Sequence, residues 1–95
     1  MRKYEIMLIL PSEADDAVIA GVTDKVTQVL GAHGGEIVKV DRWGRRRLAY
    51  EINKQTEGFY LLVECSADPE TLKELDRVLL LVDDVIRFKV VVRAA

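Results

Sequence analysis

The sequence predicts an α+β fold in which four strands form one antiparallel sheet and two helices cover one of its faces. Apolar residues alternate with period two in four segments, which is typical of strands. In two other segments they recur every three or four residues, which is typical of amphipathic helices. The order strand, helix, strand, strand, helix, strand favours the split βαβ (ferredoxin-like) arrangement β-α-β-β-α-β, with the first and third strands in the centre.

The first strand is predicted at residues 2–10 and ends at Pro11, because proline lacks the N–H that a strand ladder needs. Met7 and Ile9 make its second face apolar as well, so the strand is expected in the centre of the sheet. The fourth strand is expected over residues 85–93. On the first strand, the alternation places Tyr4, Ile6, Leu8 and Leu10 on one face.

Two helices are predicted at residues 13–33 and 68–84. Ser12 and Asp15 resemble a capping box at the start of the first helix. The second helix opens with an aspartate at the N-cap position and a proline at its first position. The apolar stripes are Val18, Ile19, Val22, Val26, Val29 and Leu30 in the first helix, and Leu72, Leu75, Val78, Leu79 and Val82 in the second.

The second and third strands are predicted to form a long hairpin. The second strand spans residues 36–52 and is interrupted at Trp43 and Gly44, where the glycine indicates a bulge or bend. Residues 53–58 are polar and predict a six-residue loop before a third strand at residues 59–65. We expect this hairpin to reach beyond the body of the domain.

Length and composition limit the classes of function. The 95 residues are expected to form one domain over residues 1–95. The single histidine, His33, and the single cysteine, Cys65, supply neither a metal-ligand set nor a nucleophile–base pair. No run of apolar residues approaches the roughly 20 that a membrane helix needs. The sequence therefore predicts a protein that is not an enzyme, with no cofactor, no small-molecule substrate and no membrane contact.

Charge is distributed unevenly along the chain. The 14 basic and 16 acidic residues give a net charge of −2, which taken alone argues against a nucleic-acid partner. Residues 13–33 carry four acids and one base, and residues 68–84 carry six acids and two bases. The predicted helices therefore total −7 and the rest of the chain +5. With both helices on one side of the sheet, we expect an acidic helical side and a basic strand side.

The basic residues are expected to gather where strands meet. If the first and fourth strands are adjacent and antiparallel, Arg2 and Lys3 neighbour the segment from Lys89 to Arg93 and form a basic rim that suits phosphate contacts. A second interpretation is that an open sheet face must be polar and is here basic by chance. Aromatic residues near the arginines of the second strand favour binding, because such rings stack or hydrogen-bond on RNA or protein.

Stacking of bases on the sheet face is not expected. The third strand begins Glu57-Gly58-Phe59-Tyr60-Leu61, in which only the Gly-Phe pair matches the signature of single-strand RNA modules of this topology. The basic lead residue is replaced by Glu57, and an aromatic position is taken by Leu61.

Three blocks of the sequence strongly resemble bacterial ribosomal protein six of the small subunit, and the resemblance runs from residue 1 to about residue 93. The blocks are Met-Arg-Lys-Tyr-Glu-Ile-Met-Leu-Ile-Leu at residues 1–10, Trp-Gly-Arg-Arg-Arg-Leu-Ala-Tyr at residues 43–50, and Glu-Gly-Phe-Tyr at residues 57–60. The resemblance implies a non-catalytic, structural protein of the cytoplasmic ribosome. Members bind the central domain of small-subunit ribosomal RNA together with ribosomal protein eighteen, as a heterodimer.

The resemblance also implies contacts for individual residues. The matching motifs imply that RNA or the partner protein is contacted by Arg2, Tyr4, Arg46, Arg47 and Tyr50. Lys54 is added because of its position on the hairpin. The charge argument adds Arg87, Lys89 and Arg93. Many members continue past the fourth strand into a tail that helps to hold the partner, whereas this sequence stops at Ala95.

The alternative function is that of a small regulatory domain with the same fold, which dimerises through its edge strands and binds a metabolite. RNA that copurifies with the protein and is removed by high salt favours the ribosomal interpretation. A clean homodimer without RNA favours the regulatory one.

Overall fold

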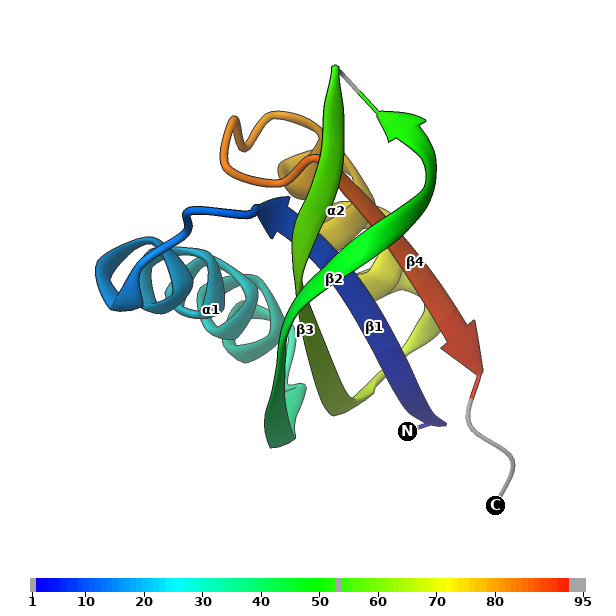
Figure 1. The fold of residues 1–95 in the computed structure, drawn as a ribbon. Coiled ribbons are helices and arrows are strands. Elements are labelled where there is room, and N and C mark those ends of the chain that lie inside the picture. The colour runs from blue at the N-terminus through cyan, green and yellow to red at the C-terminus, as the bar shows by residue number, and fades with distance from the viewer. Residues whose placement is uncertain (1, 53, 93–95) are drawn as a thin grey trace.

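A computed structural model describes residues 2–52 and 54–92, so that Arg93, one of the candidate contact residues, lies outside the described chain (Figure 1). The elements are β1 (Arg2–Pro11), α1 (Asp16–Ala32), β2 (Glu36–Ile52), β3 (Gln55–Ala67), α2 (Pro69–Leu80) and β4 (Arg87–Val92). The strands form one antiparallel sheet in the order β2-β3-β1-β4. Both helices lie on one face of this sheet, which confirms the predicted β-α-β-β-α-β fold (Figure 1).

The core lies between the helices and one face of the sheet. Strands β1 and β3 each bury every second residue against α1 and α2, as the alternation predicts. The second face of β1, with Met7 and Ile9, is half-buried, which agrees with the central place of this strand. The side chains that form the core are Tyr4, Ile6, Leu8, Leu10, Ile19, Val22, Val26, Leu30, Leu61, Val63, Cys65, Ala67, Leu75 and Leu79, with Thr71 buried beside them.

Both helices differ from the prediction at one end. The N-cap of α1 is Asp15, whose carboxylate accepts the N–H of Val18 at 2.9 Å, whereas the hydroxyl of Ser12 donates to the carboxylate of Glu13. The predicted capping box was therefore wrong. Helix α2 ends at Leu80 rather than at residues 83–84, because the next N–H groups bond three residues back and form turns.

The hairpin between β2 and β3 is tighter than predicted. Ile52 pairs with Gln55, so that the connection is residues 53–54 and β3 begins at Gln55. The prediction of a six-residue loop was wrong, since the polar residues that suggested a loop lie mostly in a solvent-exposed part of the strand. Lys54 takes a φ of 64°, the left-handed conformation that tight two-residue hairpin turns require.

The predicted interruption of β2 is a bulge. The pairing register with β3 shifts between Arg42 and Gly44, and Gly44 has a φ of 83°, which favours glycine. The strand continues through this point rather than ending there. Along residues 2–52 and 54–92, no helix is long and apolar enough to cross a membrane.

Candidate RNA- and partner-binding surface

The second half of β2, residues 44–52, leans over the face of the sheet that the helices leave open, and we call this segment the arm (Figure 1). Regular pairing with β3 is interrupted between Arg47 and Ile52. Within this stretch Leu48 is only 7% exposed. A Cβ added to Gly58 of β3 would lie 3.4 Å from Leu48 and 2.6 Å from Ile9. The missing side chain of Gly58 therefore lets the arm and β1 pack closely together.

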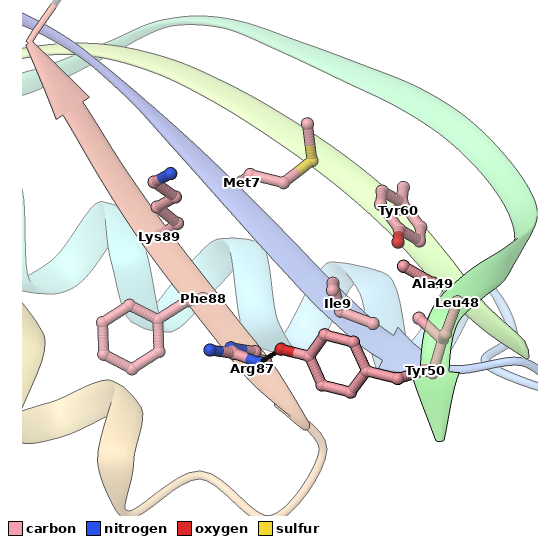
Figure 2. Close-up of a pocket in the computed structure, with 9 residues that line it drawn as sticks. All are labelled: Met7, Ile9, Leu48, Ala49, Tyr50, Tyr60, Arg87, Phe88 and Lys89. Atoms are coloured by element: carbon pink, nitrogen blue, oxygen red, sulfur yellow. Dashed lines mark hydrogen bonds between the residues drawn. The ribbon is translucent and has the colours of Figure 1, made fainter. Parts of the chain in front are cut away.

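An apolar cavity of about 260 Å³ lies between the arm and the open sheet face (Figure 2). Its floor comes from β1 and β3, and the walls come from the arm and β4. Among its lining side chains the only charged ones are cations from β4, so that anionic or neutral groups are favoured at its mouth. The lining residues are Met7, Ile9, Leu48, Ala49, Tyr50, Tyr60, Arg87, Phe88 and Lys89.

Tyr50 and Arg87 connect the arm to β4 across this cavity (Figure 2). An N–H of the Arg87 guanidinium donates a hydrogen bond to the Tyr50 hydroxyl, and the guanidinium carbon lies 5.7 Å from the centre of the Tyr50 ring. Because a guanidinium has five N–H donors, this contact leaves Arg87 able to bind a phosphate as well. Tyr50 is 60% exposed, so the pair is reachable from solvent.

Three consecutive arginines lie on the arm and are all exposed: Arg45, Arg46 and Arg47. Arg46 stacks over Trp43, with 5.1 Å between the guanidinium carbon and the ring centre. Within residues 2–52 and 54–92, none of the three forms an ion pair. Arg42 differs from them, because it is bound to Asp16 at the start of α1 at 2.7 Å. The arm thus presents three cations that form no ion pair in the described chain, although Glu57 lies opposite Arg47 in the strand pairing.

The candidate contact residues separate into two groups. Arg46, Arg47, Tyr50, Arg87 and Lys89 are exposed on or beside the arm, and Lys54 is exposed at the tip of the hairpin. Arg2 is exposed at the start of β1, at the other end of the sheet.

The predicted continuous basic rim is not formed by the described residues. Lys89 lies opposite Met7, four residues along β1 from Lys3, and this separation is about 13 Å at the rise of a strand. Val91 pairs with Glu5 in the space between them. Lys89 therefore groups with the arm and not with Arg2.

Tyr4, for which the resemblance implies contact with RNA or the partner, does not lie on this surface. It is only 4% exposed and belongs to the core on the helix-facing side of β1, so its ring offers no surface that RNA can reach.

Charge on the open sheet face is less uniform than predicted. Near the start of β1, Glu5 pairs with Glu64, and Lys39 forms an ion pair with Asp41 at 3.5 Å. Acidic and basic residues are mixed there, whereas the arm end carries cations. Half of the acids assigned to the helices lie beside the helix ends: α1 and α2 themselves hold two and three acids, and residues 13–15, 68 and 83–84 hold the other five.

The chemistry of this surface is that of binding. In the part of the chain that the structure describes, no group of three His, Cys, Asp or Glu side chains is placed to hold a metal ion. Burial raises the pKa of the Cys65 thiol, which keeps it protonated at neutral pH. The exposed groups are guanidinium, ammonium and aromatic side chains, which bind phosphates and protein surfaces.

The sequence interpretation missed the cavity under the arm. A signal for it was present, because β1 is apolar on both faces, with Met7 and Ile9 on the side away from the helices. Apolar residues on an open sheet face indicate that something packs on that face. The arm is what covers part of it.

Comparison with known proteins assigns the family. The family profile described as Ribosomal protein S6 matches residues 3–92. The chain is 48% identical over 91 residues to the small ribosomal subunit protein bS6 of Beutenbergia cavernae, covering 96% of this chain and 95% of that one. It is 42% identical over 91 residues to bS6 of Desulforamulus reducens, covering 96% of each.

A solved structure agrees with these relatives. The crystal structure of 30S ribosomal protein S6 from Thermotoga maritima superimposes with a TM-score of 0.85 at 30% sequence identity, covering 97% of this chain and 87% of that one. The chain therefore belongs to the ribosomal protein S6 family, whose members are non-enzymatic structural proteins of the small ribosomal subunit.

Proposed function

We propose that this chain binds the central domain of small-subunit ribosomal RNA together with ribosomal protein eighteen, through the arm and the adjoining part of β4. The observation that carries the proposal is the set of exposed arm arginines with no carboxylate partner among the described residues. Arg87 and Lys89 add cations from the neighbouring strand. These residues concentrate positive charge at one end of a molecule whose net charge is −2.

The RNA contacts are expected to be mainly with phosphates. Arginine forks bind phosphate oxygens in a bidentate manner, which fixes position and orientation without reading base identity. The stack of Arg46 on Trp43 and the bond between Arg87 and Tyr50 hold two of these guanidinium groups in place before RNA arrives. Such fixed groups lose less conformational entropy on binding. Affinity is expected to fall as the salt concentration rises.

The partner contacts are expected on the edge strand β2. This strand has β3 on one side only, so the backbone groups of its other edge face outward. Trp43 is 44% exposed and Val38 is 56% exposed on the same strand. Exposed aromatic and apolar residues beside arginines are typical of protein interfaces. Because the chain itself is slightly acidic, we expect strong RNA binding only when the partner protein is present.

The test compares two double variants of equal charge change. Arg46→Ala with Arg47→Ala removes two arm cations, whereas Lys25→Ala with Lys73→Ala removes two exposed cations from the helices. Binding to a central-domain RNA fragment, with ribosomal protein eighteen present, is measured by mobility shift. Circular dichroism checks that each variant is folded. We expect the arm variant alone to bind more weakly, and equal binding by both variants would refute the assignment of the surface.

A further inference from the structure

The end of helix α2 presents two neighbouring leucines to solvent. Leu80 and Leu81 are each 75% exposed, more than any other large apolar side chain in the described chain. They are not needed to hold α2 in place, since Leu75 and Leu79 are the buried leucines of this helix. Single exposed apolar residues are common, but an adjacent pair beside a cavity marks an interaction surface.

The cavity beside the leucines lies between the end of α2 and the start of β4. It has a volume of about 280 Å³. Leu80 forms part of its wall and is itself largely exposed. Its lining is largely apolar, so it suits the apolar side chain of another molecule. The lining residues are Leu79, Leu80, Val85, Ile86, Arg87 and Phe88.

Negative charge surrounds this corner of the molecule. Asp83 and Asp84 are exposed in the turn after α2, and the exposed Asp76 lies one helical turn before Leu80. The carbonyl end of the helix adds a partial negative charge.

The nearby cations do not cancel this negative charge. Arg77 donates to the carboxylate of Glu74, and this bond lowers the pKa of Glu74. Arg87 turns its guanidinium to Tyr50 on the other side of the sheet. Arg87 keeps its charge, because the Tyr50 hydroxyl is neutral, but Asp76, Asp83 and Asp84 outnumber it. The net charge around the two leucines is therefore negative.

We propose that residues 79–88, with Asp76, form a docking site for a protein segment that carries Leu, Ile, Val or Met side chains next to Lys or Arg. The apolar side chains would enter the cavity and cover Leu80 and Leu81, and the cations would meet the three aspartates. RNA is disfavoured because its phosphates would meet the same aspartates. A symmetric dimer through this corner is disfavoured because it would place Asp83 and Asp84 against their own copies. The site shares Arg87 and Phe88 with the cavity under the arm, but its leucines and aspartates are not part of the arm surface, and it needs no RNA.

The test uses the full chain and a synthetic helical peptide that has leucines along one side and lysines along the other. Binding is mapped by shifts of backbone amide signals in NMR spectra. We expect the largest shifts at residues 76–88. Leu80→Gln with Leu81→Gln should weaken binding roughly tenfold, because two apolar contact areas are lost. Asp83→Asn with Asp84→Asn should weaken it about two- to fivefold, as expected for exposed charge pairs.

Controls separate this site from general attraction to an acidic protein. Val92→Thr changes an exposed apolar residue at the end of β4, outside the proposed site, and should leave peptide affinity unchanged. A peptide with glutamates in place of lysines should bind much more weakly. The proposal is overturned if the shifts spread equally over Asp16 and Asp24 of α1, or if the leucine variant binds like the unchanged protein. It is also overturned if sedimentation without peptide shows self-association that depends on the two leucines.

Discussion

Replacing Gly58 by alanine tests how the arm is held against the sheet. The new Cβ would lie 2.6 Å from Cγ2 of Ile9 and 3.4 Å from Cδ2 of Leu48, so that one or both side chains must move. Overpacking of this kind costs about 1–3 kcal/mol. Reduced freedom of the unfolded chain returns about 0.4–1 kcal/mol. We therefore expect a net loss of about 0–2.6 kcal/mol in the free energy of unfolding, centred at about 1.3 kcal/mol.

Gly21 of α1 provides the matched control, because a Cβ added there meets no atom within 4 Å. Gly21→Ala should stabilise the protein by about 0.5–1 kcal/mol, the usual gain inside a helix. Urea unfolding followed by circular dichroism measures both changes. For a chain of this size, each kcal/mol should move the melting temperature by roughly 4–8 °C.

A second measurement locates the effect of Gly58→Ala. If the arm is pushed away from β1, trypsin should cut after Arg45, Arg46 or Arg47 faster than in the unchanged protein. A Gly58→Ala protein with unchanged or increased stability and unchanged trypsin sensitivity would refute the close packing of Leu48 and Ile9 on this glycine.

Three further predictions concern other parts of the fold. Asp15→Ala should cost about 1 kcal/mol through loss of the α1 N-cap, whereas Ser12→Ala should cost almost nothing in the same urea titration. Tyr50→Phe removes the hydroxyl that Arg87 binds, so amide hydrogen exchange in the arm should speed up while global stability falls by about 1 kcal/mol or less. Burial raises the pKa of Cys65, so its contribution to stability is complete below the unfolded-state pKa and is lost as pH rises. Between pH 8 and 10 the unchanged protein should therefore lose more stability than Cys65→Ala, and parallel curves would contradict this.

The sequence predicted the helices and strands because residues that are buried at regular intervals produce a regular pattern of apolar residues. The alternation along β1 and the stripes of α1 and α2 identify the core, since these residues are buried by the sheet–helix packing itself. Element ends were less well predicted. Asp15 and Ser12 are both good cap residues, and only the three-dimensional turn after Pro11 decides which of them caps α1.

The hairpin shows a second limit of local patterns. Residues 55–58 are mostly polar and were interpreted as a loop, but they form a strand because β2 pairs with them as far as Gln55. A polar segment indicates exposure to solvent, but it does not distinguish a loop from an exposed strand, because the two have similar compositions.

The sequence predicted which residues form the candidate surface, but not how these residues are arranged in space. Arg46, Arg47, Tyr50 and Arg87 were all singled out, and the fold brings them to the same end of the open face. The bond between Tyr50 and Arg87 joins residues 37 positions apart, a distance over which no local pattern carries information. The apolar alternation of β1 already indicated that Tyr4 is buried. This pattern should have outweighed the motif that suggested contact with RNA or the partner.

The salt dependence of RNA binding tests most directly the claim that the arm is the RNA-contacting surface. The affinity for a central-domain RNA fragment, with ribosomal protein eighteen present, is measured at several salt concentrations. Loss of Arg46 and Arg47 should lower the slope of log affinity against log salt by about 1.4–1.8, since each phosphate contact contributes about 0.7–0.9. Loss of Lys25 and Lys73 should leave the slope unchanged. Equal slopes for the unchanged protein and the arm variant would contradict the account.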